Sequence, residues 1–220
     1  MCYVDLQNKI TWPMHQDLVN WLIQVQMENL LPKILWLVMN IINCFLTKFI
    51  VPGDELQLVG ITAIFIAAKY EECQVHSVKM FTIFEPCTPC SKKDIFRQEM
   101  IILQTLKFKI SHYCSLYRWM QKINWAGNYN IRMRRLGKFF MEITLLDWRF
   151  LGHKPSPITP FSMFTTRKIL GKSWVSFLVS FPVYLVSLRI LHHLFVTDSG
   201  FQDLLWLLRG LSPAWLSASC

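Results

Sequence analysis

Residues 56–72 read LQLVGITAIFIAAKYEE, an apolar run that ends in a charged cluster beginning at Lys69. The run is too short to span a bilayer, which takes about 20 apolar residues, and it suits a helix buried on nearly all sides. Gly60, Ala63 and Ala67 recur three and four residues apart, so they share one helical face. We expect neighbouring helices to approach this helix closely along that face.

The rest of the chain also predicts helices, with no alternation typical of strands. The expected helices cover about 14–29, 32–49, 54–72, 75–84, 91–107, 112–125, 131–148 and 155–170. Ser91, with Asp94 three residues later, predicts a capping box at the start of one of them. The sequence therefore predicts an all-α fold.

The composition allows one large or two small domains with a substantial core, since 53% of the 220 residues are hydrophobic. The net charge of +9 permits an acidic partner. Arg132–Arg135 (RMRR) is either a solvated helix face or a contact for a phosphate or an acidic peptide. Seven irregularly spaced cysteines and the lack of a signal-peptide pattern in residues 1–20 indicate a reducing intracellular compartment.

Four segments, taken in order, resemble the cyclin box of B-type, fungal-like mitotic cyclins. They are 14–25 (MHQDLVNWLIQV), 34–46 (ILWLVMNIINCFL), 56–72 and 95–108 (IFRQEMIILQTLKF). Two later segments, 149–156 (RFLGHKPS) and 167–172 (RKILGK), resemble the second domain of the same family. The resemblance implies a cyclin fold: one complete five-helix box with a preceding short helix at 1–110, then an incomplete or divergent second cyclin-like helical domain at 111–172.

Residues 173–220 form a divergent apolar tail in which the resemblance stops. Residues 173–188 are uncharged, but this stretch is short for a membrane span, and Pro182 interrupts it. We favour a divergent, mis-spliced or frame-shifted end. A membrane anchor and a divergent but native packing are the alternatives.

The resemblance also assigns a kinase-binding surface. In cyclins, the Lys of a K-Y-E-E motif and a Glu on the fifth helix hydrogen-bond with kinase backbone, and these positions are Lys69 and Glu99 here. Tyr70, Phe108 and Ile110 occupy positions that supply apolar contact around them. The residues alone would equally explain Lys69 by the helix dipole or by an ion pair with Glu99, and such a pair could orient both side chains before binding.

A substrate-docking groove for Arg-x-Leu peptides lies, in this family, on the first helix and the start of the third. Asp17 replaces an apolar residue of that groove, and Gln24 replaces an acidic one. A charge must be desolvated when a leucine inserts, so we expect docking of kinase substrates or inhibitors to be weakened. The positions that agree with the family pattern are Met14, Trp21, Leu56 and Gln57.

A buried Arg–Asp pair of the family is replaced here by His15 and Asn43. Because both members differ, no lone buried charge remains. We expect a neutral hydrogen bond between His15 and Asn43, and an unfavourable protonation of His15 in acid.

Neither a catalytic constellation nor a convincing metal site is visible. Cys73, His76, Cys87 and Cys90 are zinc-type ligands. The helix expected between the two pairs separates them by roughly 15 Å, whereas zinc ligands lie about 2.3 Å from the metal. We therefore expect free thiols, no cofactor and no catalysis.

The resemblance implies a regulatory subunit that binds and activates a cyclin-dependent protein kinase in G2/M-type cell-cycle control, in the nucleus and cytoplasm. No nucleic-acid partner is expected, and membrane association is not favoured. The alternatives are a degenerate cyclin-like protein with weak or no kinase activation, and a helical protein anchored to a membrane through residues 173–220.

Overall fold

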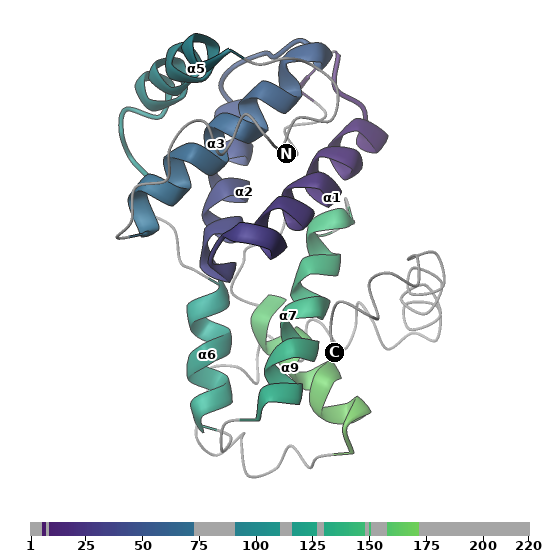
Figure 1. Ribbon diagram of the computed structural model, residues 1–220. Helices are drawn as coiled ribbons and strands as arrows, with labels where there is room; N and C mark the ends of the chain where they lie inside the picture. The colour runs from purple at the N-terminus through teal and green to yellow at the C-terminus, as the bar shows by residue number, and fades with distance from the viewer. Residues whose placement is uncertain are drawn as a thin grey trace. The chain divides into compact units, whose positions relative to one another are not determined.

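The structure is a computed structural model. It describes residues 6–7, 9–72, 91–110, 116–126, 130–147, 150 and 158–171. The predicted helix at 75–84, the four zinc-type side chains and the tail at 173–220 lie outside the described residues. Within the described ranges all regular elements are helical, which confirms the predicted all-α class (Figure 1).

The chain divides into two compact units: Met1–Arg118 with Glu142–His153, and Trp119–Met141 with Lys154–Cys220. The described helices are α1 (Trp12–Asn29), α2 (Pro32–Leu46), the 3-10 helix η2 (Gly53–Glu55), α3 (Leu56–Glu71), α5 (Lys92–Thr105), α6 (Leu116–Ala126), α7 (Ile131–Leu146) and α9 (Ile158–Ile169).

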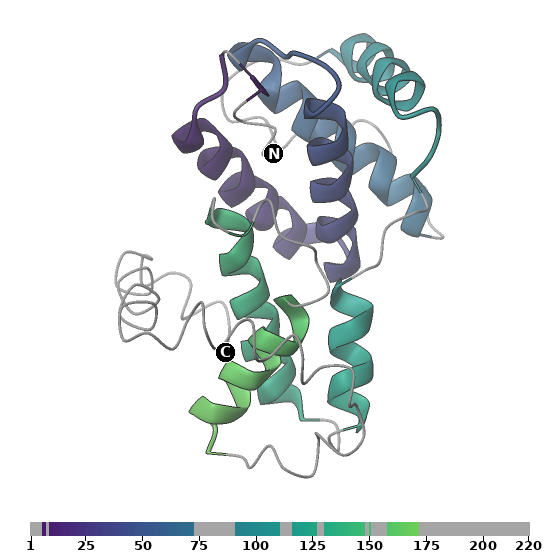
Figure 2. The ribbon, with the colours of Figure 1, turned by 180° about the vertical axis from the view of Figure 1, so that it is seen from behind.

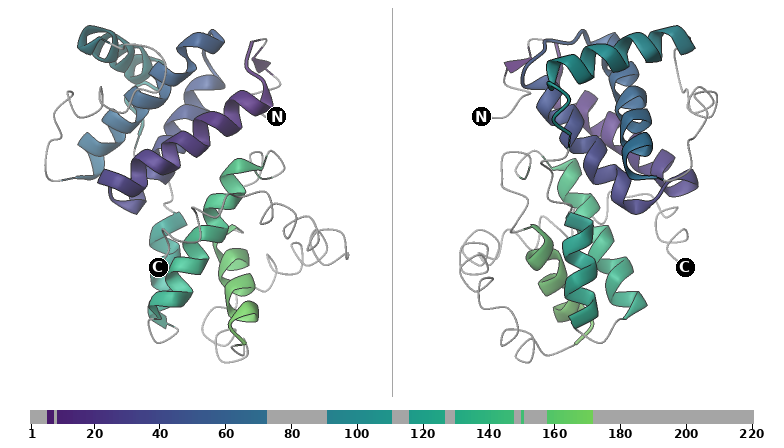
Figure 3. Two further views of the ribbon diagram at one scale, coloured as in Figure 1. Left: turned by 45° about the vertical axis from the view of Figure 1, so that its right-hand side comes forward. Right: turned by 90° about the vertical axis from the view of Figure 1, so that its left-hand side faces the viewer.

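Helix α3 is the centre of the first unit, and α1, α2 and α5 all contact it (Figures 1 and 2). Leu56 and every residue from Val59 to Ala68 are buried, as the apolar run predicts. In the right-hand view of Figure 3, α5 crosses α3. A helix that is apolar all round is stable only when neighbours cover each of its faces. This packing confirms the prediction of a helix buried on nearly all sides.

Gly60 is the point of close approach between α3 and α1. A Cβ atom at this position would lie 2.8 Å from Leu18 Cδ1 and 3.3 Å from Trp21 Cζ3. Real Cβ contacts are rarely this short, so a larger residue would displace these side chains of α1. The small-residue face of the run therefore does admit a neighbouring helix.

Local signals explain where the helices begin and end. Ser91 and Asp94 form the predicted capping box at the start of α5. Helix α2 ends at Leu46, earlier than predicted. There the Thr47 hydroxyl donates to the Asn43 carbonyl at 2.6 Å and ends the regular pattern.

In the second unit, α6, α7 and α9 meet around buried methionine side chains. A Cβ at Gly137 would lie 2.7 Å from Met163 Sδ and 3.5 Å from Met120 Sδ. Met133, Met120 and Met163 are fully buried. This unit thus has its own apolar core, made adaptable by flexible thioethers.

Candidate functional site

Lys69, in the last turn of α3, forms an ion pair with Glu99 on α5. The Lys69 side chain is 37% exposed, whereas that of Glu99 is 11% exposed. The ammonium carries three N–H donors, so a contact with Glu99 leaves donor capacity on its solvent side. The structure therefore brings together the two polar residues that the sequence predicted.

Two aromatic rings support this pair from below. Lys69 Nζ lies 4.1 Å from the centroid of the Phe65 ring, a favourable cation–π arrangement. The Phe96 ring meets Phe65 edge-on, at 6.0 Å between centroids and 73° between planes. Sequence reasoning missed both rings. The signal was present, because Phe65 precedes Lys69 by four residues and Phe96 precedes Glu99 by three.

Exposed apolar side chains surround the pair on α3, α5 and the turn after α5. Tyr70 is 52% exposed and Phe108 is 64% exposed, and Ile110 is half-buried. Phe96 and Met100 on α5, which the sequence analysis did not select, are 48% and 51% exposed. Large exposed side chains near one another are typical of a surface that a partner covers.

The turn after α5 is strained at the residues that present this surface. Lys107 and Phe108 have φ values of 52° and 55°, in the left-handed region that bulky side chains rarely adopt. The Phe108 amide donates to the Leu103 carbonyl at 2.9 Å, which holds the turn in place. Strained backbone that persists at one point is typical of a functional site.

A second surface feature is an apolar pocket of about 270 Å³ beside α1 and the start of α3. Four of its residues are the predicted Met14, Trp21, Leu56 and Gln57, and the structure adds Leu18 and Gly53. Asp17 also lines the pocket, but Gln24 does not. The pocket suits a peptide side chain, and its one charged residue is the one that the sequence predicted to disturb it.

Comparisons with known proteins fit this arrangement. The family model "Cyclin, N-terminal domain" matches residues 1–111, and "Cyclin, C-terminal domain" matches residues 113–187. The chain belongs to the cyclin family. The second match extends beyond residue 172, where the resemblance read from the sequence stopped.

Two fungal cyclins and one viral cyclin illustrate the similarity. The chain is 42% identical to a G2/mitotic-specific cyclin-B of Emericella nidulans over 83% of this chain and 38% of that protein. It is 43% identical to G2/mitotic-specific cyclin-2 of Saccharomyces cerevisiae over 72% of this chain and 33% of that protein. The chain thus spans little more than a third of these relatives.

A solved structure shares the fold. The X-ray structure of a viral cyclin from herpesvirus saimiri aligns with a TM-score of 0.72 over 86% of each chain, at 16% identity. This likeness confirms the cyclin fold predicted from the sequence.

In this cyclin, the predicted hydrogen bond between His15 and Asn43 is not formed. The amide oxygen of Asn43 is buried without a hydrogen-bond partner, and His15 instead bonds with the backbone of Leu145. Burial lowers the pKa of His15 from 6.5 to about 4, and the Leu145 bond opposes this shift in part. The prediction was wrong about the partner of His15, because that partner lies on a distant helix.

Three further expectations concern charge, metal and membrane. Arg132 and Arg135 are exposed on α7, and Met133 between them is buried, as one face of a helix requires. In the described part of the chain, no group of three or more His, Cys, Asp and Glu could hold a metal ion. None of the helices in that part has the length and apolarity that crossing a membrane would take.

Proposed function

We propose that this protein binds and activates a cyclin-dependent protein kinase in G2/mitotic cell-cycle control. The observation that carries the proposal is the half-exposed Lys69–Glu99 pair within a rim of exposed apolar side chains. Its fungal relatives named as G2/mitotic-specific cyclins support the same function.

The proposed surface combines apolar area with polar groups of fixed orientation. Tyr70, Phe108 and Ile110 would lose water on binding, which drives association. Lys69 would donate to kinase carbonyls, and Glu99 would accept from kinase N–H groups. Because the two side chains already orient each other, less conformational freedom is lost on binding.

Activation would be allosteric. A kinase samples positions of the helix that carries its catalytic Glu, and only the inward position is active. A partner that binds the active position more tightly shifts the population towards it. The protein itself needs no catalytic residue for this role, and we assign no reaction to it.

The decisive experiment measures binding and activation with purified cyclin-dependent kinase from one of the fungi named above. We expect Lys69→Ala to weaken binding by about 10- to 100-fold, because a hydrogen bond to a charged group contributes about 1.5–3 kcal/mol. Glu99→Ala should act similarly, since it leaves Lys69 without its carboxylate. Lys48→Ala, at an exposed lysine beyond the end of α2, is the matched control.

Histone phosphorylation in the same samples separates the two candidate functions. Binding with stimulated phosphorylation supports the activator. Binding without stimulation would favour the degenerate cyclin-like protein, for which the orphaned Asn43 oxygen and Asp17 in the pocket speak. Equal binding by the wild type, Lys69→Ala and Glu99→Ala would overturn the assigned surface.

A further inference from the structure

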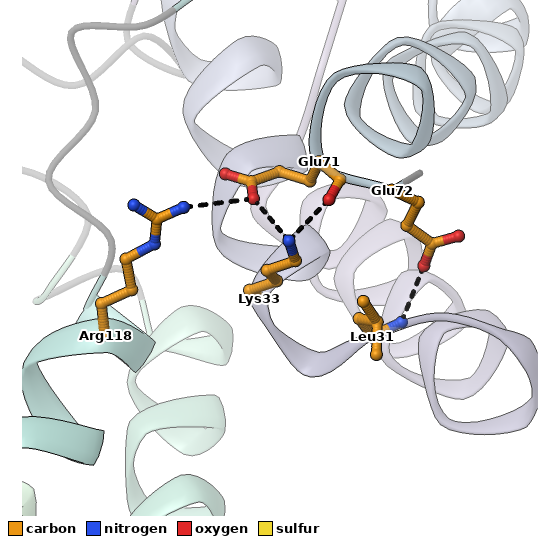
Figure 4. Close-up of polar contacts among 5 residues, drawn as sticks. All are labelled: Leu31, Lys33, Glu71, Glu72 and Arg118. Carbon is orange, nitrogen blue, oxygen red and sulfur yellow. Dashed lines mark hydrogen bonds and ion pairs between the residues drawn. The ribbon is translucent and has the colours of Figure 1, made fainter. Parts of the chain in front are cut away.

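The last turn of α3 and the first turn of α2 exchange charged side chains (Figure 4). Lys33, in the first turn of α2, places its Nζ 2.6 Å from the backbone oxygen of Glu71 and 2.8 Å from Glu71 Oε2. In return, Glu72 Oε1 accepts from the backbone N–H of Leu31 at 3.2 Å. We call these four residues, Leu31, Lys33, Glu71 and Glu72, the α2–α3 clamp.

Each charge of the clamp lies at the unfavourable end of its own helix. A helix N-terminus carries partial positive charge, yet Lys33 is near the N-terminus of α2. A helix C-terminus carries partial negative charge, yet Glu71 and Glu72 end α3. Crossing over corrects both, because Lys33 caps the carbonyl end of α3 and Glu72 caps the amide end of α2.

The exchange stabilises the two helix ends only while they stay together. Leu31 is the N-cap residue of α2 and shows no side-chain capping bond, so Glu72 supplies the acceptor for its N–H. The Lys33 and Glu71 side chains are 27% and 15% exposed, so solvent screens this pair less than a surface pair. Arg118 Nη2 adds a weaker contact to Glu71 Oε2 at 3.4 Å, from a side chain that is 64% exposed.

Lys69 and Tyr70 belong to the same final turn of α3 as Glu71. The ends of helices fray, because their last carbonyls lack partners within the helix. We propose that the α2–α3 clamp is a positioning device that holds this turn, so that Lys69 and Tyr70 meet the kinase in one arrangement. The inference rests on the proposed function and assigns Lys33 a role in kinase binding without any contact with the kinase.

The first test is a double-mutant cycle in kinase binding. Lys33→Met removes the ammonium and keeps an apolar stem, and we expect binding about fivefold weaker. In a Lys69→Ala background the same change should alter binding less than about twofold, because the residue that the clamp positions is gone. Lys33→Arg, which keeps a cation, should restore most of the affinity.

Two controls separate positioning from general loss of stability. Lys48→Met makes the same substitution at the other end of α2 and should leave binding unchanged. Gln7→Ala removes bonds from the Gln7 side chain to the Leu46 and Phe49 carbonyls and from the Val51 amide. It should lower stability and spare kinase affinity, since these bonds are far along the chain from Lys69.

The second test is amide hydrogen exchange in the free protein. The Glu72 amide donates to the Ala68 carbonyl at 2.9 Å, so its exchange reports on the last turn. Lys33→Met should speed this exchange about tenfold and leave the centre of α3 protected. Unchanged exchange would overturn the clamp as a device that holds the turn.

The possible results distinguish the inference from the function on which it rests. Wild-type protein that fails to bind the kinase overturns the proposed function, and with it the role of the clamp in binding. Wild-type binding that Lys33→Met leaves intact overturns the inference alone. A fivefold loss that persists in the Lys69→Ala background also overturns it, because Lys33 would then act independently of Lys69.

Discussion

The two ends of α3 carry charge in opposite ways. At its C-terminal end Lys69 is paired with Glu99, and Lys33 is paired with Glu71. At its N-terminal end Leu56 lines an apolar pocket together with Asp17. Among the described residues, Asp17 takes part in no ion pair.

The difference indicates which surface is prepared for a partner. Paired, partly exposed charges bind with little reorganisation, because their orientation is already set. A carboxylate at an apolar pocket must instead lose water without compensation when an apolar side chain enters. We therefore expect kinase binding to depend on the C-terminal end of α3 and peptide docking to be impaired at the N-terminal end.

Acid gives the largest expected effect, and it acts through His15 on α1. The folded-state pKa of about 4 lies below the ordinary 6.5, so the unfolded chain binds the proton more tightly. The stability due to neutral His15 is thus complete above pH 6.5 and is lost as the pH falls to about 4. We expect a loss of about 3 kcal/mol over this range.

Urea unfolding of the wild type and of His15→Gln at pH 7, 5.5 and 4 measures this term. The difference between the two proteins should grow at neutral pH and shrink in acid, because the variant has no imidazole to protonate. Parallel pH profiles would show that burial of His15 does not govern the acid response.

Gly60→Leu gives the next largest effect and tests whether the two ends of α3 are separable. The added carbons would collide with Leu18 and Trp21, which also line the pocket. We expect the free energy of unfolding to fall by about 1–3 kcal/mol, the usual cost of overpacking. Gly60→Ala is the control and should stay within about 1 kcal/mol, because alanine gains helix propensity.

Calorimetric unfolding and kinase binding, measured on the same samples, decide the result. The folded fraction of Gly60→Leu should bind the kinase as the wild type does, because Lys69 lies at the other end of the helix. A parallel loss of kinase affinity would show that the two ends are coupled through α3.

Features that depend on local spacing were predictable from the sequence. The buried run of α3, its small-residue face at Gly60 and the capping box of Ser91 and Asp94 all follow from residues three or four apart. The Lys69–Glu99 pair required more, since the two residues are on different helices. The resemblance to cyclins supplied that step, and the structure confirms the pair.

Contacts between distant segments were not predictable. Lys33 and Glu71 are each unfavourable on their own helix, so neither sequence segment indicates the α2–α3 clamp. The bond between His15 and Leu145 joins helices that periodicity cannot place side by side. Propensity and spacing describe one helix at a time, whereas these contacts depend on how helices pack.

Asp17→Leu has the smallest expected effect and sharpens the comparison most directly. Replacing the charge with an apolar side chain should increase the affinity for an Arg-x-Leu peptide about fivefold, or about 1 kcal/mol, because the inserted leucine no longer desolvates a carboxylate. Asp17→Asn separates charge from shape and should give part of the gain. Fluorescence anisotropy with a labelled peptide measures both, and kinase affinity should not change in either variant. A peptide affinity that ignores both substitutions would mean that the pocket is not the docking site, whereas a change in kinase affinity would mean that the two ends of α3 do not act separately.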